Sequence, residues 1–221
     1  MTITNNNDEL SRNLLELTIE ERALIMGTLL GDAHLQKRGG SYRLKVTHGI
    51  KQKEYVKWKH SKLIRFCTTT QGPAVKVDNK GFETVTFYTS SGMWLKDIHE
   101  LFYKSVNGRS VKTITQELIN NLPMHPMVLA SFFMDDGSVR NDCYAGKLAT
   151  QGFTKEESKL FCQYLNKWGI QGNVVAHSVS KNQYYIGLPV STFGKLVQTI
   201  ESIVKEIPTM EYKLNGPNKT P

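Results

Sequence analysis

Two aspartates stand at the ends of apolar helical runs, and their chemistry and placement indicate a divalent cation. Asp32 follows the apolar run 23–30, and Asp136 follows the apolar run 127–134. If these helices lie side by side, both carboxylates project from neighbouring C-terminal ends, where they repel each other and the negative helix dipoles unless cations intervene. Ligation by oxygens alone, with positions left for water and phosphate, suits Mg²⁺ better than a zinc site. The two acids therefore predict a magnesium centre.

The residue spacing inside the two runs allows such a close pairing. Gly27 and Gly31 are four residues apart in the first run, and Ser131 stands four residues before Asp135 in the second. Small or compact side chains at this spacing lie on one helix face and let two backbones approach each other. We expect these two faces to meet.

The elements around the acids are predicted to occur twice. Each half holds an acid-bearing helix, a basic strand, an amphipathic helix, a hairpin-like strand pair and a closing helix. The predicted ranges are 18–30, 42–48, 52–66, 74–77 with 82–89, and 91–103 in the first half, and 126–136, 147–151, 154–168, 174–179 with 183–188, and 191–206 in the second. The order is αββαββα in both halves, and the 104 residues from Asp32 to Asp136 indicate duplicated domains rather than a solenoid. We predict a first repeat over 18–115, a second over 116–214, and tails at 1–17 and 215–221.

The composition favours a polyanionic partner. Lysine and arginine total 28 against 20 aspartates and glutamates, and this net charge of +8 attracts nucleic acid. No apolar run approaches the roughly 20 residues that a bilayer requires, so no membrane span is expected. Three cysteines without a CxxC pair argue against a disulfide framework or a zinc site and favour a reducing compartment. The N-terminal residues resemble neither a signal nor a transit peptide, so a protein that works in an organelle is expected to be made there.

The two helical runs also resemble a known family. The segments 25–33 (IMGTLLGDA) and 129–137 (LASFFMDDG) resemble the two signature helices of the LAGLIDADG homing endonucleases, in the single-chain, double-motif branch. Ala33 replaces the usual final glycine, and Met26 and Asp135 stand where the family favours small residues. The resemblance implies an α/β (α+β) fold, in which two pseudo-twofold-related αββαββα repeats place antiparallel β-sheets into a DNA-binding saddle.

The resemblance assigns roles to further residues. Lys112 and Lys213 follow the two acids by 80 and 77 residues and match the lysine that reaches the active site after the last helix of each half. Gln151 matches a polar residue that hydrogen-bonds solvent near the metal, and the 104-residue offset makes Thr47 its counterpart. The catalytic residues so predicted are Asp32, Asp136, Lys112, Lys213 and Gln151. The predicted ligands of two or three Mg²⁺ ions, which Mn²⁺ is expected to replace, are Asp32, Asp136, Gly31 and Asp135.

The reaction that follows from the resemblance is metal-assisted hydrolysis of DNA phosphodiesters, without a covalent enzyme intermediate. Lys112 and Lys213 would orient or polarise water rather than act as bases, since an ordinary lysine is protonated at pH 7.

Strands are predicted to read the target. In 42–48, Arg43, Lys45 and Thr47 share one face, opposite an apolar underside. A two-stranded ribbon fits the major groove, where arginine reads guanine and glutamine reads adenine. Segments 36–38 and 140–141 are expected to be loops that reach bases or phosphates. The predicted DNA contacts are His34, Gln36, Lys37, Arg38, Tyr42, Arg43, Lys45, Thr47, Thr84, Thr86, Tyr88, Ser138, Arg140, Asn141, Lys147, Ser178, Lys181, Gln183 and Tyr185.

Other polar residues are expected to be less specific. The basic charges of 51–65 are spread around the helical wheel, which predicts a mostly solvated face that touches phosphate at most at the rim of the saddle. The six histidines show no HxH or HExxH spacing, which argues against a histidine-based metal site.

Three functions remain open from the sequence. The first is a monomeric, site-specific endonuclease whose unlike halves cut both strands of a long asymmetric double-stranded DNA target. The second is an RNA maturase of the same fold, which assists splicing of its host intron RNA. The third is a DNA-binding regulator without catalysis. Retention of both Asp32 and Asp136 favours the nuclease, and proteins of this kind are often encoded in introns of mitochondria or chloroplasts.

Overall fold

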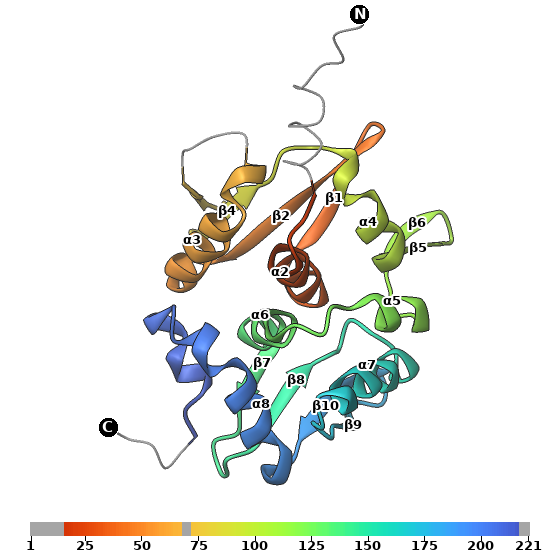
Figure 1. Cartoon of the computed structure of the whole chain (residues 1–221), viewed down its shortest axis with the longest axis vertical. Helices are drawn as coiled ribbons and strands as arrows, with labels where there is room; N and C mark the ends of the chain where they lie inside the picture. Colours follow the sequence, from red (N-terminus) through yellow and green to blue (C-terminus); the bar gives the residue numbers. More distant parts are fainter. Residues whose placement is uncertain (1–15, 68–71, 217–221) are drawn as a thin grey trace, which may run out of the picture.

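The computed structural model describes residues 16–67 and 72–216, and in it two α/β halves face each other across a central helix pair (Figure 1). The first half comprises α2 (Ile19–Leu30), β1 (His34–Arg38), β2 (Ser41–Gly49), α3 (Lys53–Lys62), β3 (Ala74–Val77), β4 (Glu83–Tyr88) and α4 (Lys96–Phe102). The second comprises α6 (Pro126–Asp136), β7 (Gly137–Val139), β8 (Gly146–Ala149), α7 (Lys155–Lys167), β9 (Asn173–Ser178), β10 (Gln183–Leu188) and α8 (Val190–Val204). A hairpin of β5 (Tyr103–Val106) and β6 (Arg109–Lys112) and the short α5 (Gln116–Asn121) connect them.

Local signals fix where the main helices begin. Thr18 and Thr154 both form complete capping boxes, in which the threonine hydroxyl accepts from a backbone N–H three residues on and the glutamate there accepts from the threonine N–H. Pro126 occupies the first turn of α6, where no backbone N–H is needed. These three starts confirm the predicted ones.

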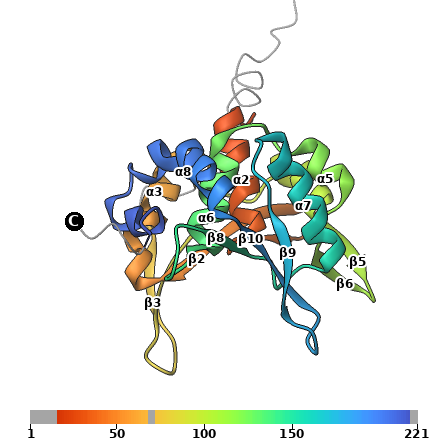
Figure 2. The same ribbon diagram turned by 90° about the horizontal axis from the view of Figure 1, so that it is seen from below.

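The two sheets have the same connectivity. The first has the antiparallel order β1-β2-β4-β3 and the second the order β7-β8-β10-β9, so each strand has one counterpart in the other half. This repeat confirms the predicted fold class. Figure 2 shows the helices gathered on one side and the hairpins β3–β4 and β9–β10 projecting on the other. None of the helices in the described ranges is long and apolar enough to cross a bilayer.

Several predicted boundaries are corrected by the structure. Residues 36–38 were expected in a loop, but they form the second part of β1, paired with β2. The helix expected over 52–66 is α3 flanked by two 3-10 turns. The β5–β6 hairpin was not predicted, because its two strands have only four residues each and are too short to show a clear alternation of polar and apolar residues. The division of the chain at 115/116 stays a prediction; it falls at the N-cap of α5. The predicted tails lie almost entirely outside the described residues.

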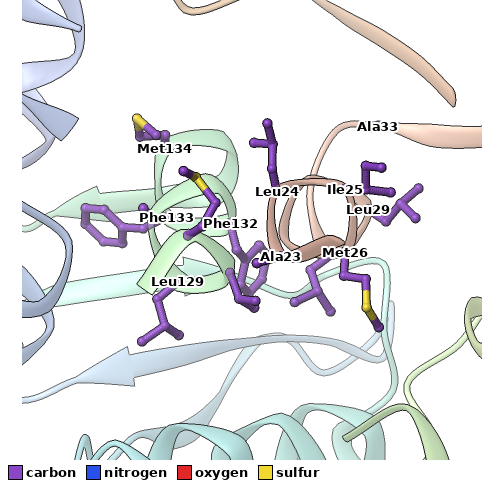
Figure 3. Packing of buried hydrophobic residues seen from close by; sticks show 14 of the residues in the cluster. Ala23, Leu24, Ile25, Met26, Leu29, Ala33, Leu129, Phe132, Phe133 and Met134 are labelled. Carbon is purple, nitrogen blue, oxygen red and sulfur yellow. The ribbon is translucent and has the colours of Figure 1, made fainter. Parts of the chain in front are cut away.

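The two halves are joined by the contact between α2 and α6. Figure 3 shows these helices side by side, with Ile25 and Leu29 pointing away from α6 and Phe133 pointing away from α2 into its own half. Every residue of α2 from Ala23 to Leu30 is buried, because one face of the helix meets α6 and the other meets its own sheet. The interface therefore continues the core of each half.

Gly27 is expected to be irreplaceable at this contact. A β-carbon there would meet the Ser131 hydroxyl and lie 2.6 Å from the Val128 carbonyl oxygen, which is backbone and cannot rotate away. Gly27→Ala is therefore expected to lower the free energy of unfolding by about 1–3 kcal/mol, as overpacking does. Gly194→Ala is the matched control: it lies inside α8 with open space around it, and should stabilise by about 0.5–1 kcal/mol. Urea unfolding of both variants tests this, and a neutral Gly27→Ala would contradict the close contact.

Candidate metal centre and nucleic-acid interface

The structure brings Asp32 and Asp136 to the same end of the helix pair. Asp136 is the last residue of α6, and Asp32 follows the C-cap of α2, so each acid lies where its helix passes into the first strand of a sheet. The backbone N–H of Asp32 lies 3.3 Å from Oδ2 of Asp135, the residue before Asp136, so the two segments are in contact. Burial and the negative charge of Asp32 raise the pKa of Asp136. The predicted meeting of the two acids at the seam is thus present in the structure.

The two carboxylates have different surroundings. Asp32 Oδ2 lies 3.3 Å from His48 Nδ1, and its side chain is 45% exposed. The hydrogen bond from His48 lowers the pKa of Asp32, although burial opposes it. Asp136 receives no side-chain hydrogen bond from the described residues, and burial together with the charge of Asp32 raises its pKa to about 7. Asp32 is therefore held as an anion, whereas ionisation of Asp136 is disfavoured, although the charges of Lys112 and Lys213 partly oppose the rise in its pKa.

Both predicted lysines reach the acid ends of the helices. Lys112 Nζ donates to the carbonyl oxygens of Gly31 at 3.0 Å and Ala33 at 2.9 Å, and Lys213 Nζ donates to the Gly137 oxygen at 2.6 Å. Each lysine thus binds the carbonyls beside the acid of its own half. Burial lowers the pKa of both amines, and the neighbouring aspartates oppose that shift.

Gln151 shares a small pocket with Asp136. The pocket has a volume of about 200 Å³ and is lined by Lys112, Asp136 and Gln151 together with the backbone around Gly31. Strand pairing corrects the counterpart expected for Gln151. His34 pairs with Lys45, and Ser138, at the same distance from its acid, pairs with Lys147. The equivalent of Gln151 is therefore Gly49 rather than Thr47, and glycine has no amide side chain at this position.

Two of the predicted metal ligands are already engaged. The Asp135 side chain is fully buried, and its oxygens accept from the Lys59 amine at 2.6 Å, the Tyr55 hydroxyl at 2.7 Å and the Thr28 hydroxyl at 2.8 Å. The Gly31 oxygen accepts from Lys112. Ligand atoms of Asp32, His48 and Asp135 lie within 4.8 Å of one another. Because the Asp135 oxygens are saturated, we retain only Asp32 and Asp136 as candidate cation ligands.

The first sheet presents the predicted polar face. Residues alternate along β2, with Arg43, Lys45 and Thr47 partly exposed and the intervening side chains buried. Arg43 Nε donates to Gln36 Oε1 at 2.9 Å, and its guanidinium lies 4.2 Å from the centre of the Tyr88 ring. These contacts orient the arginine on the open face of the sheet.

The other predicted contacts of this half differ in accessibility. Thr86 is only 4% exposed and its hydroxyl lies 2.8 Å from that of Thr47, whereas Thr84 is half-buried at the edge. His34 lies beside Lys45 on the same face, and burial and that lysine lower its pKa. Lys37 and Arg38 are exposed at the end of the β1–β2 hairpin.

The prediction for Tyr42 is corrected. Its side chain is 9% exposed and lies on the underside of β2 with Leu44, and its ring centre is 4.3 Å from that of His99. The alternation places Tyr42 opposite the face of Arg43, so we leave it out of the candidate DNA contacts.

The second sheet lines a broad hollow of about 760 Å³. Predicted contacts that line it are Ser138, Arg140, Asn141, Lys147 and Tyr185, with Gln151 at its inner end. Arg140 forms a two-point ion pair with Asp142, which occupies part of its guanidinium. The three remaining residues, Ser178, Lys181 and Gln183, lie at the far end of the β9–β10 hairpin.

Four buried residues near the acids were not predicted as part of the site: Thr28, His48, Tyr55 and Lys59. Lys59 is fully buried, so it is an exception to the prediction that this basic helix has a mostly solvated face. The signal that could have separated Lys59 from its neighbours is its position on the apolar face of α3, four residues after Tyr55.

The raised pKa of Asp136 predicts a stability that depends on pH. Its folded pKa is about 7 and its ordinary value is 3.8, so the native state keeps a proton that the unfolded chain releases. The stabilisation is full below pH 3.8 and is lost progressively until the pH passes about 7. In EDTA at pH 8, Asp136→Asn should therefore raise the free energy of unfolding by about 2 kcal/mol, a value reduced because the carboxyl group is partly exposed. The melting temperature should rise by about 4–8 °C.

At pH 4 the parent and Asp136→Asn should melt at nearly the same temperature. Asp97→Asn is the control, because that carboxylate is exposed and paired with Arg22, and it should bring no gain at either pH. Thermal melts at the two pH values provide the measurement. An Asp136→Asn variant that gains nothing at pH 8 would contradict the raised pKa.

Fold and site together define a class of protein. A single chain holds two similar repeats, which meet through two helices that each lead into an aspartate, and two open antiparallel sheets lie beside these aspartates. The sequence pattern described as the LAGLIDADG DNA endonuclease family matches residues 22–196, and the chain belongs to this family.

Three known proteins illustrate the relationship. The chain is 34% identical over 140 residues to the probable intron-encoded DNA endonuclease 3 of Mycosarcoma maydis, which covers 63% of this chain and 95% of that protein. It is 27% identical over 233 residues to the cytochrome b mRNA maturase bI2 of Saccharomyces cerevisiae, covering 98% of this chain but only 52% of the maturase. The solved structure of the homing endonuclease I-WcaI bound to its DNA recognition sequence matches with a TM-score of 0.77 at 21% identity, over 97% of this chain and 96% of that one. This last likeness shows a shared fold.

Proposed function

We propose that this protein is a homing endonuclease that makes a metal-dependent double-strand break in a long, asymmetric DNA site. The observation that carries the proposal is the convergence of Asp32 and Asp136, one from each repeat, at a seam flanked by two open polar sheets. One acid per strand is what a double-strand break requires. The covalent joining of unlike halves replaces the two-fold symmetry of a dimer and suits a monomer that reads a site without a palindrome.

The residues present fit a divalent cation. Asp32 and Asp136 offer carboxylate oxygens that form no ion pair with a lysine or arginine of residues 16–67 and 72–216, and Mg²⁺ prefers such ligands. When bound, divalent ions supply Lewis-acid stabilisation of charge at the attacked phosphate. Lys112 and Lys213 are anchored on the carbonyls beside the acids, where their amines would orient water and offset phosphate charge. Gln151, in the pocket of Asp136, would hydrogen-bond water on that side alone.

The two sheets would bind the DNA on either side of the cut. Arg43 held by Gln36, and Lys147 on the second sheet, are the side chains we propose to reach base edges. Lysines at the rim of this two-sheet surface would bind phosphates, which adds affinity for DNA of any sequence.

DNA binding should depend steeply on salt. If six to ten phosphates are contacted, affinity should fall by about 10³–10⁵-fold between 50 and 200 mM salt. Fluorescence anisotropy in Ca²⁺ or EDTA measures this without cleavage. A flat salt response would contradict binding along both sheets.

The decisive experiment is cleavage of a randomised DNA library in Mg²⁺, followed by sequencing of the ends. We expect one long asymmetric site cut on both strands, with no products in EDTA. The double variant Asp32→Asn/Asp136→Asn controls for a contaminating nuclease. Binding of one duplex sequence without metal-dependent cutting would instead support the non-catalytic regulator.

The alternative is an RNA maturase, and one observation favours it: a named maturase aligns over 98% of this chain. This chain spans about half the length of that maturase, so the maturase's activity stays a proposal here. A splicing assay with the intron that encodes the chain, run beside the plasmid-cleavage assay, separates the two functions. Because the relatives are named for introns and for cytochrome b mRNA, we propose that the gene lies in an organellar intron.

A further inference from the structure

A buried ammonium lies beneath the acids, outside the residues assigned to the reaction. Lys59 Nζ is fully buried and has three acceptors for its three N–H bonds: Thr28 Oγ1 at 2.5 Å, Asp135 Oδ1 at 2.6 Å and His48 Nε2 at 3.1 Å. Burying a charge is costly unless every polar atom is satisfied, and here each one is. We call Thr28, His48, Tyr55, Lys59 and Asp135 the Lys59 cluster.

The Lys59 cluster crosses the seam from the second half to the first. Asp135 comes from α6, and its four partners come from α2, β2 and α3. Its Oδ2 also accepts from the backbone N–H of Asp32 at 3.3 Å. A side chain of the second half therefore holds the main chain of the first half's acid.

His48 extends the cluster to the Asp32 carboxylate. Lys59 Nζ lies 3.1 Å from His48 Nε2, and because an ammonium can only donate, this contact assigns the Nδ1–H tautomer to His48. That nitrogen lies 3.3 Å from Asp32 Oδ2 and 3.0 Å from Gln52 Oε1. The Nδ1–H therefore hydrogen-bonds Gln52 Oε1 and also faces Asp32 Oδ2, from a ring whose other nitrogen contacts the buried lysine.

Among the described residues, the second half has no histidine that faces Asp136 as His48 faces Asp32. By strand pairing, Thr150 is the counterpart of His48, and it too is buried, but its hydroxyl contacts Ser158 at 3.1 Å and the Tyr184 carbonyl. The counterpart of Asp135 is Gly31, one residue before its acid and without a side chain. A Cβ at Gly31 would lie 2.6 Å from that of Asp135, so only one half can carry the carboxylate.

We propose that His48 is a positioning residue for Asp32, held by the Lys59 cluster, so that the DNA strand whose cut depends on Asp32 is cleaved before the strand that depends on Asp136. This rests on the proposed endonuclease function. A preorganised ligand needs no reorientation when the cation arrives, whereas Asp136 must be ordered by the cation itself.

The test resolves the two strands. A duplex with the cleavage site, labelled at both 5′ ends, is cut by the parent, His48→Ala and His48→Asn, and the rate for each strand is measured separately. Loss of an outer-shell hydrogen bond typically costs about 10–100-fold. We therefore expect His48→Ala to slow one strand by that factor, the same strand that Asp32→Asn affects most, and to leave the other within about threefold. His48→Asn should recover the rate, because its amide N–H can replace Nδ1–H. Thr150→Ala, the matched change in the second half, should leave the strand ratio unchanged.

Equal slowing of both strands by His48→Ala, or no rescue by asparagine, would overturn the proposal, since a merely structural role gives that pattern. An activity-free readout completes the test: the ¹⁵N spectrum of the metal-free imidazoles should show His48 as the Nδ1–H tautomer, and the Nε2–H tautomer would refute the hydrogen-bond chain. If the parent cuts neither strand of any site, the endonuclease function fails, while the spectrum still decides whether His48 is held as described.

Discussion

Asp32→Asn and Asp136→Asn are each expected to abolish double-strand cleavage while leaving DNA binding intact. Asparagine keeps the shape of the side chain but removes the charge that holds a divalent cation. Both acids lie at the helix seam rather than on the strand faces, so target recognition does not depend on them. We expect the rate of linearisation to fall by at least about 10³-fold, which corresponds to about 4 kcal/mol in the activation barrier.

Plasmid linearisation in Mg²⁺ measures cleavage, and a gel-shift assay in Ca²⁺ measures DNA binding. Asp97→Asn is the control, since its carboxylate is exposed on α4 and paired with Arg22. Full cleavage by Asp32→Asn or by Asp136→Asn would remove that acid from the reaction. Loss of binding together with cleavage would show that the carboxylate has a structural role at the seam.

The position of this pair could be predicted from the sequence because each acid is marked by local features. An apolar run of helical length, its cap and the acid at its end lie within one short segment, 18–32 in the first half and 125–136 in the second. Strands with period-two alternation show their exposed face in the sequence. Arg43 and Lys45 were predicted on the open face for that reason, and they lie there. The same alternation also assigns Tyr42 to the buried face, so its placement among the DNA contacts disregarded the pattern.

Features that depend on contacts between distant segments could not be predicted. The bond between Lys59 and Asp135 joins residues 76 apart. The spacing of Lys59, four residues after Tyr55, points to the buried face of the helix, but the sequence does not show that this face meets Asp135 of α6. The counterpart of Gln151 depends on strand register, which a constant offset of 104 residues misses because the β1–β2 hairpin and the β7–β8 connection differ in length. Asp135 was predicted as a metal ligand for the same reason. The residues that bind its carboxylate belong to the other half of the chain, and the sequence does not show that they lie beside it.

This buried pair leads to the second large effect. Lys59→Met should lower the free energy of unfolding by about 3–5 kcal/mol, because it leaves the Asp135 carboxylate without its cation in a site closed to water. Burial lowers the pKa of Lys59, and the charge of Asp135 opposes that shift, so the carboxylate favours the ammonium form of Lys59. Lys57→Met is the matched control on the same helix. Its amine pairs with Glu54 in solvent, so the expected loss is below about 1 kcal/mol.

A double-mutant cycle isolates the interaction. Asp135→Ala alone should cost a similar amount, since it strands the ammonium, but Lys59→Met/Asp135→Ala should cost less than the sum of the two by about 2 kcal/mol or more. The reason is that no unpaired charge remains in the double variant, and alanine fits beside Gly31, where the Asp135 side chain is tightly packed. Urea unfolding at pH 7 gives all four free energies. Additive losses would mean that Lys59 and Asp135 do not depend on each other, and the link that the Lys59 cluster makes between the halves would then contribute nothing beyond its separate contacts.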